Sequence, residues 1–200
     1  MPYLTHAEGR SAATASTLMT VYVIANAIAG PTAGILTSRH PIRRGTLIEA
    51  MITASALAWL VVLVWPGPAP LWMLFLLTIC LGISLPGGNV GFDVARTFQP
   101  GNRLATATGV GITGGFFFGL LEIEIIGLLL DILCPGGRYT LSGFRWAMST
   151  QLFFFAIGLI GLEINQRRLY RIMADNGVTV PTWRLSLIHI SEPTRLLSIS

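Results

Sequence analysis

Two long stretches without a formal charge limit what this chain can fold into. They run from Ser11 to Ser38 and from Ala50 to Phe92. A helix that crosses the hydrocarbon core of a bilayer needs about 20 mostly apolar residues. Charged side chains make up only 11% of the chain, whereas soluble domains carry about 25%. The sequence therefore predicts an all-α integral membrane protein.

The apolar pattern predicts about five membrane-spanning helices. The second uncharged stretch is too long for one span, and the sequence PGPAP at residues 66–70 divides it into two. Residues 1–14 precede the first span, and a cytoplasmic tail over 176–184 follows a helix bundle over 15–175. The expected spans cover about 15–37, 46–65, 71–93, 105–132 and 146–165.

The arginines indicate how the helices are oriented. Short cytoplasmic loops of membrane proteins carry an excess of Lys and Arg. Eight arginines fall in the loops that follow the first, third and fifth spans, and three fall on the other side of the membrane. The first set is therefore expected in the cytoplasm. The eight are Arg39, Arg43, Arg44, Arg96, Arg103, Arg167, Arg168 and Arg171, and the three are Arg10, Arg138 and Arg145. The net charge of +4 is thus a topology signal, and no nucleic-acid partner is expected.

The loop after the first span carries a recognisable motif. Residues 34–44 read GILTSRHPIRR. This segment resembles the cytoplasmic loop motif of the major facilitator superfamily, Gly-x-Leu-x-Asp-Arg-x-Gly-Arg-Arg or Lys. Gly34, Leu36, Arg39 and Arg43 match, whereas Ser38 replaces the acidic residue of the motif.

The resemblance implies a partial transporter. Residues 2–175 would correspond to the end of the seventh helix through the twelfth helix of a secondary active transporter, which moves a small solute across a bacterial cytoplasmic membrane by alternating access. The expected partners are the lipid bilayer, the missing N-terminal six-helix half and an unknown small solute. A stand-alone membrane scaffold of five helices without transport activity is the alternative.

The last sixteen residues do not fit this pattern. Residues 185–195 read LSLIHISEPTR, which resembles the conceptual translation of an adapter used in sequencing libraries. We therefore expect residues 185–200 to be a non-native tail, and His189 and Glu192 to carry no function.

The fourth span combines a glycine repeat with two carboxylates. Gly111, Gly115 and Gly119 recur every four residues and share one helix face. Faces of small residues let membrane helices approach closely, which predicts helix packing here. Glu122 follows on the same face and is a proton-coupling candidate, because carboxylates at membrane depth are costly and often functional. Glu124 lies about 200° around the helix.

The first span carries a second face of small residues. Ala25, Ala29 and Ala33 recur every four residues, with Gly30 and Gly34 beside them. The family resemblance places this helix and the fourth span at the interface between the two halves of a transporter. Static packing of one helix on another explains the pattern equally well.

The third span carries a polar stripe. Thr78, Gly82 and Asn89 project within roughly 60° of one another at 100° per residue. The resemblance makes this a cavity-lining helix, so these residues are substrate-cavity candidates. An interhelical hydrogen bond is the alternative for Asn89. The sequence PGG at residues 86–88 interrupts the backbone ladder and predicts a bend.

Nothing in the sequence favours an enzyme. The part before residue 185 contains only His6 and His40, in loops on opposite sides of the membrane, and no phosphate-binding glycine loop. Cys80 and Cys134 form no C-x-x-C pair and are interpreted as packing residues. No catalytic residue, metal or cofactor is therefore expected.

Overall fold

The computed structural model describes residues 2–39, 44–91, 103–135 and 139–175, with side chains as far as residue 168. Arg43 of the loop motif, the tail at 176–184 and the expected non-native segment 185–200 lie outside these residues. The chain divides into two units, Met1–Leu162 and Glu163–Ser200. The first unit holds nearly all of the described packing.

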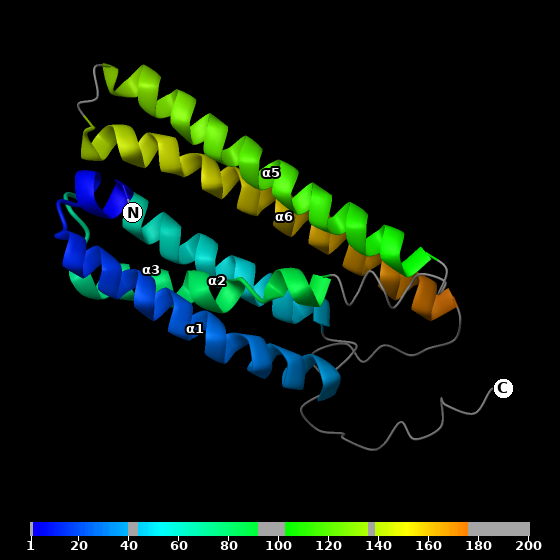
Figure 1. The fold of residues 1–200 in the computed structure, drawn as a ribbon. Helices are drawn as coiled ribbons and strands as arrows, with labels where there is room; N and C mark the ends of the chain where they lie inside the picture. The colour runs from blue at the N-terminus through cyan, green and yellow to red at the C-terminus, as the bar shows by residue number, and fades with distance from the viewer. Residues whose placement is uncertain (1, 40–43, 92–102, 136–138, 176–200) are drawn as a thin grey trace. The chain divides into compact units, whose positions relative to one another are not determined.

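The described residues form helices and no strand, which confirms the all-α class. A short π-helix, η1 (Tyr3–Ala7), comes first. The long helices are α1 (Ala12–Arg39), α2 (Arg44–Val64), α3 (Leu71–Ser84), α5 (Leu104–Leu133) and α6 (Leu141–Asp175), as Figure 1 shows. Leu85 and Pro86 form a turn after α3, and the chain is helical again over 87–91. The α-helix is thus interrupted at Pro86, where the sequence predicted a bend in the third span.

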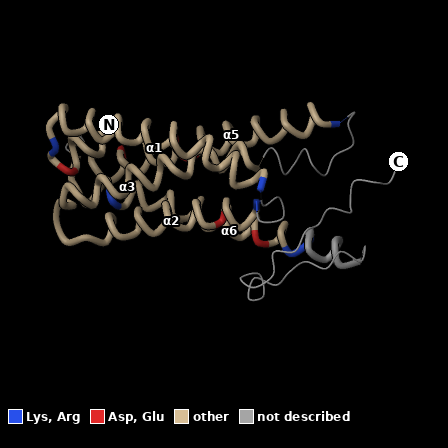
Figure 2. Tube along the Cα trace, turned by 90° about the horizontal axis from the view of Figure 1, so that it is seen from below, with Lys and Arg blue, Asp and Glu red and all other residues tan. Residues whose placement is uncertain are grey.

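Four described segments are long and apolar enough to cross a membrane. They are Ala12–Arg39, Arg44–Val64, Leu71–Gly91 and Leu141–Arg168. Figure 2 shows how few Arg, Asp and Glu residues these helices carry. Five spans were expected, and α5 is not among the four, although it is 30 residues long. Its first half, residues 104–121, carries no formal charge, whereas its second half carries Glu122, Glu124 and Asp131.

The main contact between long helices joins α1 to α3. A Cβ atom added to Gly82 of α3 would lie 2.6 Å from the Tyr22 carbonyl oxygen and 2.8 Å from the Ala25 Cβ, both of α1. The two backbones therefore meet where α3 has no side chain. Ala29 and Ala33 of α1 are also buried. The small-residue face of α1 is thus used within the described bundle.

Two buried clusters hold the bundle at its two ends. The larger one gathers η1, the first turns of α1, the second half of α2, α3 and Phe144 of α6. The smaller one joins Ala33, Ile48, Met51 and Val90, near the end of α1 and the start of α2.

Between the two clusters, a pair of serines links α2 to α3. Ser55 Oγ lies 2.5 Å from Ser84 Oγ, and Ser84 Oγ donates to the Met51 carbonyl at 2.7 Å. Such hydrogen bonds between helices replace the missing water in a bilayer.

We predict that α5 crosses the membrane despite its carboxylates. Alkaline phosphatase is active only outside the cytoplasm, and green fluorescent protein fluoresces only inside. A fusion at residue 68 should show phosphatase activity, and a fusion after Asp175 should fluoresce. The two points lie on opposite sides of the membrane if α3, α5 and α6 all cross it, because three crossings lead from one side to the other. Phosphatase activity after Asp175 would show that α5 does not cross. A fusion within residues 40–43, expected in the cytoplasm, is the control.

We predict that Gly82→Ala lowers the stability of the bundle by about 1–3 kcal/mol, the usual cost of overpacking. The added methyl group would overlap the α1 backbone. Gly30→Ala is the matched control, because nothing lies within 4 Å of a Cβ at that position and alanine favours a helix by about 0.5–1 kcal/mol over glycine. Denaturation of the purified chain by sodium dodecyl sulfate, followed by circular dichroism, measures both. Equal midpoints for the two variants would contradict the assignment of this contact.

Candidate functional site

A network of polar side chains surrounds the α2–α3 loop. The Tyr3 hydroxyl donates to Glu8 Oε1, and the Ala69 N–H donates to Glu8 Oε2, both at 2.6 Å. Arg10 Nη2 donates to the Ala69 carbonyl oxygen, and Arg145 Nη2 donates to that of Gly67, both at 2.5 Å. We call Tyr3, Glu8, Arg10 and Arg145 the loop anchor. It ties η1, the segment just before α1 and the start of α6 to one loop.

The composition of the loop explains why it needs these partners. Pro66, Pro68 and Pro70 have no backbone N–H, so the loop can form few hydrogen bonds of its own. Gly67 adopts a φ of 86°, which side chains other than glycine rarely allow. A carboxylate and two guanidinium groups therefore satisfy the backbone groups that the loop leaves unpaired.

Glu8, the acidic residue of the loop anchor, is buried. It is only 3% exposed, and both of its carboxylate oxygens accept hydrogen bonds. Tyr3 lies between Trp59 of α2 and Phe144 of α6, with ring centroids 5.6 and 6.1 Å away. Burial raises the pKa of the Tyr3 hydroxyl well above its usual range, and the hydrogen bond and charge of Glu8 raise it further. Tyr3 is therefore a neutral donor to a buried carboxylate throughout the physiological pH range.

Sequence reasoning missed this network. Arg10 and Arg145 were counted only as charges on the less basic side of the membrane, and Glu8 was given no role. The one available signal was that Arg10 and Arg145 are expected on the same side of the membrane as the proline-rich loop at residues 66–70. That signal does not say which backbone groups the charges meet.

The cavity candidates of the third span do not come together in the described structure. Thr78 is buried, and its hydroxyl donates to the carbonyl oxygens of Leu74 and Phe75 in the same helix. Gly82 lies against α1. Asn89 is exposed, beyond the turn at Leu85 and Pro86. Their role in a substrate cavity stays a prediction.

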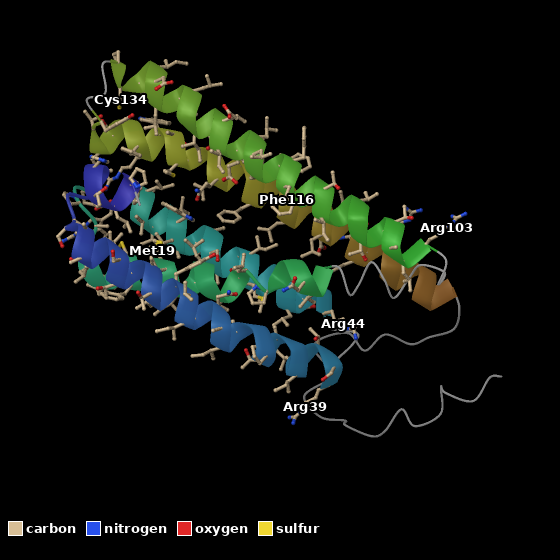
Figure 3. The ribbon with its side chains drawn as sticks, in the orientation of Figure 1. Met19, Arg39, Arg44, Arg103, Phe116 and Cys134 are labelled. Carbon is tan, nitrogen blue, oxygen red and sulfur yellow. The ribbon has the colours of Figure 1, made fainter. Side chains whose placement is uncertain are left out.

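Helix α5 has no buried residue. Phe116, labelled in Figure 3, is 70% exposed. Nothing described lies within 4 Å of a Cβ at Gly115 or Gly119, and Gly111 is exposed. The glycine face of this helix therefore has no described partner.

The two carboxylates of α5 differ in exposure. Glu122 is half-buried, whereas Glu124 is exposed. This difference in exposure agrees with the prediction that the two side chains lie on opposite faces of the helix. Proton coupling by Glu122 stays a prediction, since the described residues include no partner for its carboxylate.

The loop-motif residues lie where α1 ends. Gly34, Leu36 and Arg39 are exposed on the last turns of α1. Arg44, which begins α2, donates through Nε to the Thr37 carbonyl oxygen at 3.4 Å. Figure 3 shows Arg39 and Arg44 at the same end of their two helices.

Comparison with known proteins adds no assignment. Within the described part of the chain, no three His, Cys, Asp or Glu side chains are grouped so that they could hold a metal ion. No protein-family model matches the chain, and no curated protein or solved structure does either.

We predict that Glu8→Ala destabilises the bundle by about 2–6 kcal/mol, because it leaves the Tyr3 hydroxyl and the Ala69 N–H unpaired and each buried group costs about 1–3 kcal/mol. Glu8→Gln should recover part of the loss, since its amide oxygen can still accept one hydrogen bond. Glu124→Gln, at an exposed carboxylate, is the control and should change little. Thermal unfolding in detergent compares the stabilities of the three variants with that of the unchanged chain. Equal stability of the Glu8→Ala and Glu8→Gln variants would contradict the prediction.

Proposed function

We propose that the chain is the C-terminal part of a secondary active transporter that moves a small solute across a bacterial cytoplasmic membrane by alternating access. The observation that carries the proposal is the sequence motif at Gly34, Leu36, Arg39 and Arg43, which begins in the last turns of α1 and ends in the sequence just before α2. Arginines next to two long apolar helices also fit a cytoplasmic loop.

The uncovered glycine face of α5 supports a larger assembly. An apolar side chain can face lipid without cost, so exposed phenylalanines alone call for no partner. A face of small residues is different, because its function in membranes is to let another helix approach closely. The open surroundings of Gly115 and Gly119 therefore favour further helices beyond the described ones. The N-terminal six-helix half is the partner that this proposal supplies.

The break after α3 fits a helix that moves. Leu85 and Pro86 separate α3 from residues 87–91, and interrupted helices are common where transporters bind their substrates. The serine pair Ser55–Ser84 fixes α3 to α2 just before this break. Motion about the turn would leave that link intact.

A stand-alone scaffold of five helices is the second candidate. The exposed charge on α5 favours it, because Glu124 and Asp131 would then face water or lipid headgroups rather than a protein interior. The two candidates differ in whether the natural gene extends upstream.

Sequencing the source locus with long reads across both ends separates the two. The transporter proposal expects an open frame that continues upstream through about seven more apolar spans, and unrelated codons or a stop after Arg184. An in-frame stop just before Met1, with residues 185–200 encoded in the genome, would overturn it.

We predict that liposomes containing only this chain take up no solute above the level of empty liposomes, because half of the cavity wall is absent. The full gene product should accumulate one member of a panel of sugars, acids, drugs, peptides and inorganic anions. In that protein Glu122→Gln should abolish accumulation driven by a pH gradient but retain solute exchange. Glu124→Gln is the matched control. Robust uptake by the isolated chain would contradict the prediction.

A further inference from the structure

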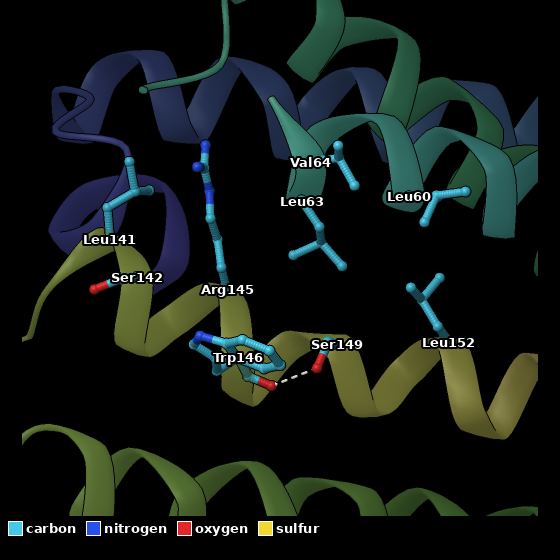
Figure 4. Close-up of a pocket in the computed structure, with 9 residues that line it drawn as sticks. All are labelled: Leu60, Leu63, Val64, Leu141, Ser142, Arg145, Trp146, Ser149 and Leu152. Atoms are coloured by element: carbon cyan, nitrogen blue, oxygen red, sulfur yellow. Dashed lines mark hydrogen bonds between the residues drawn. The ribbon is translucent and has the colours of Figure 1, made fainter. Parts of the chain in front are cut away.

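A groove runs between the end of α2 and the start of α6, with a volume of about 650 Å³. Figure 4 shows Leu60, Leu63 and Val64 of α2 facing Leu141, Arg145 and Leu152 of α6. Leu60 is 43% exposed and Val64 is 73% exposed. No described part of the chain therefore covers the groove.

The apolar part of the groove covers about two thirds of one leaflet of a bilayer. Arg145 and Leu152 are seven residues apart on one helix, which corresponds to about 10 Å at 1.5 Å per residue. Half of the hydrocarbon core of a bilayer is about 15 Å. The lining beyond Arg145 is mostly aliphatic, with Leu60, Leu63, Val64 and Leu152 beside Trp146 and Ser149, so an extended alkyl chain fits the groove in polarity.

The end of the groove near the α2–α3 loop is cationic. Arg145 donates to the Gly67 carbonyl oxygen, and among the described residues it forms no ion pair. Its Nε is enclosed and has no hydrogen-bond partner. Glu8, the nearby carboxylate of the loop anchor, is engaged by Tyr3 and Ala69. Arg10 donates to the Ala69 carbonyl oxygen of the same loop, so two positive charges meet one negative charge around the loop, and this end attracts an anion.

The position of Trp146 agrees with a lipid boundary. Its side chain lies beside Arg145 and is 70% exposed. Tryptophan collects at the level of lipid headgroups, where its ring is half in the apolar phase and its N–H is in water. Arg145 therefore lies at the depth where a phosphate group lies.

We propose that this groove binds an anionic phospholipid of the leaflet that contains the α2–α3 loop, with one acyl chain along Leu60, Leu63 and Leu152 and the headgroup at Arg145. The site goes beyond the proposed function, because it requires only that α2 and α6 cross the membrane. A bound lipid would neutralise the unpaired charge and fill the space between the two helices.

Native mass spectrometry of the full purified chain tests the headgroup. Phosphatidylglycerol and phosphatidylcholine with the same acyl chains are added in equal amounts. Phosphatidylglycerol should be retained about fivefold more, since one arginine at a membrane surface contributes about 1 kcal/mol toward an anionic lipid. Arg145→Gln should remove this preference, and Arg103→Gln, at the start of α5, should keep it. An undiminished preference in the folded Arg145→Gln chain would overturn the proposal.

A second variant tests the acyl chain without touching the loop anchor. Leu60→Trp fills the groove at a half-exposed position, and it should reduce retention of both lipids. Circular dichroism checks that each variant is folded. Should Arg145→Gln fail to fold, Leu60→Trp decides, and unchanged lipid retention then rejects the site.

Photo-cross-linking identifies the occupant in the membrane. Leu152→benzoylphenylalanine, illuminated in cells that express the full chain, should give an adduct whose mass increases by one phospholipid. An adduct with a second copy of the chain or with another polypeptide would show that a protein covers the groove, and would overturn the proposal.

Discussion

The approach of α3 to α1 at Gly82 is the contact on which the described bundle depends. In a bilayer, apolar side chains gain little by leaving lipid for protein, so helices associate through close van der Waals packing and hydrogen bonds. Gly82 lets the α3 backbone reach the Tyr22 carbonyl and the Ala25 side chain. The serine pair Ser55–Ser84 then adds α2 to the same helix. Helix α3 is thus the centre of the described packing, with α1 on one side and α2 on the other.

The loop anchor resolves a conflict between topology and backbone chemistry. Arginines are disfavoured on the side of the membrane that faces away from the cytoplasm, yet two of the three expected there, Arg10 and Arg145, donate to carbonyl oxygens of the α2–α3 loop. A loop with three prolines cannot satisfy its own backbone. The cost of two misplaced charges is therefore offset by the hydrogen bonds that they supply, and Glu8 balances one of the two charges.

Much of the fold could be predicted from the sequence, because the length of an apolar stretch decides whether a membrane helix forms. The uncharged stretches at 11–38 and 50–92 and the prolines at 66–70 locate α1, α2 and α3 closely. Pro86 marks the turn after α3 correctly. The packing partners of the glycines were harder to predict, because nothing in the sequence distinguishes Gly82 from Gly115. Only the arrangement of the helices shows that, among the described residues, Gly82 meets another backbone and Gly115 meets none. The loop anchor could not be predicted, since hydrogen bonds to a loop backbone leave no pattern in the chain.

Helix α5 and the groove beside α6 differ in what their open surfaces require. The glycine face of α5 offers close approach at Gly115 and Gly119, which suits another helix. The groove combines aliphatic walls with an arginine that has no ion pair within the described residues, which suits an amphiphile with an anionic head. A helix in the groove would bury Arg145 away from both water and phosphate, and an unpaired charge in such a place is costly. The same bundle therefore presents one surface for protein and another for lipid, and Arg145 is the residue that distinguishes them.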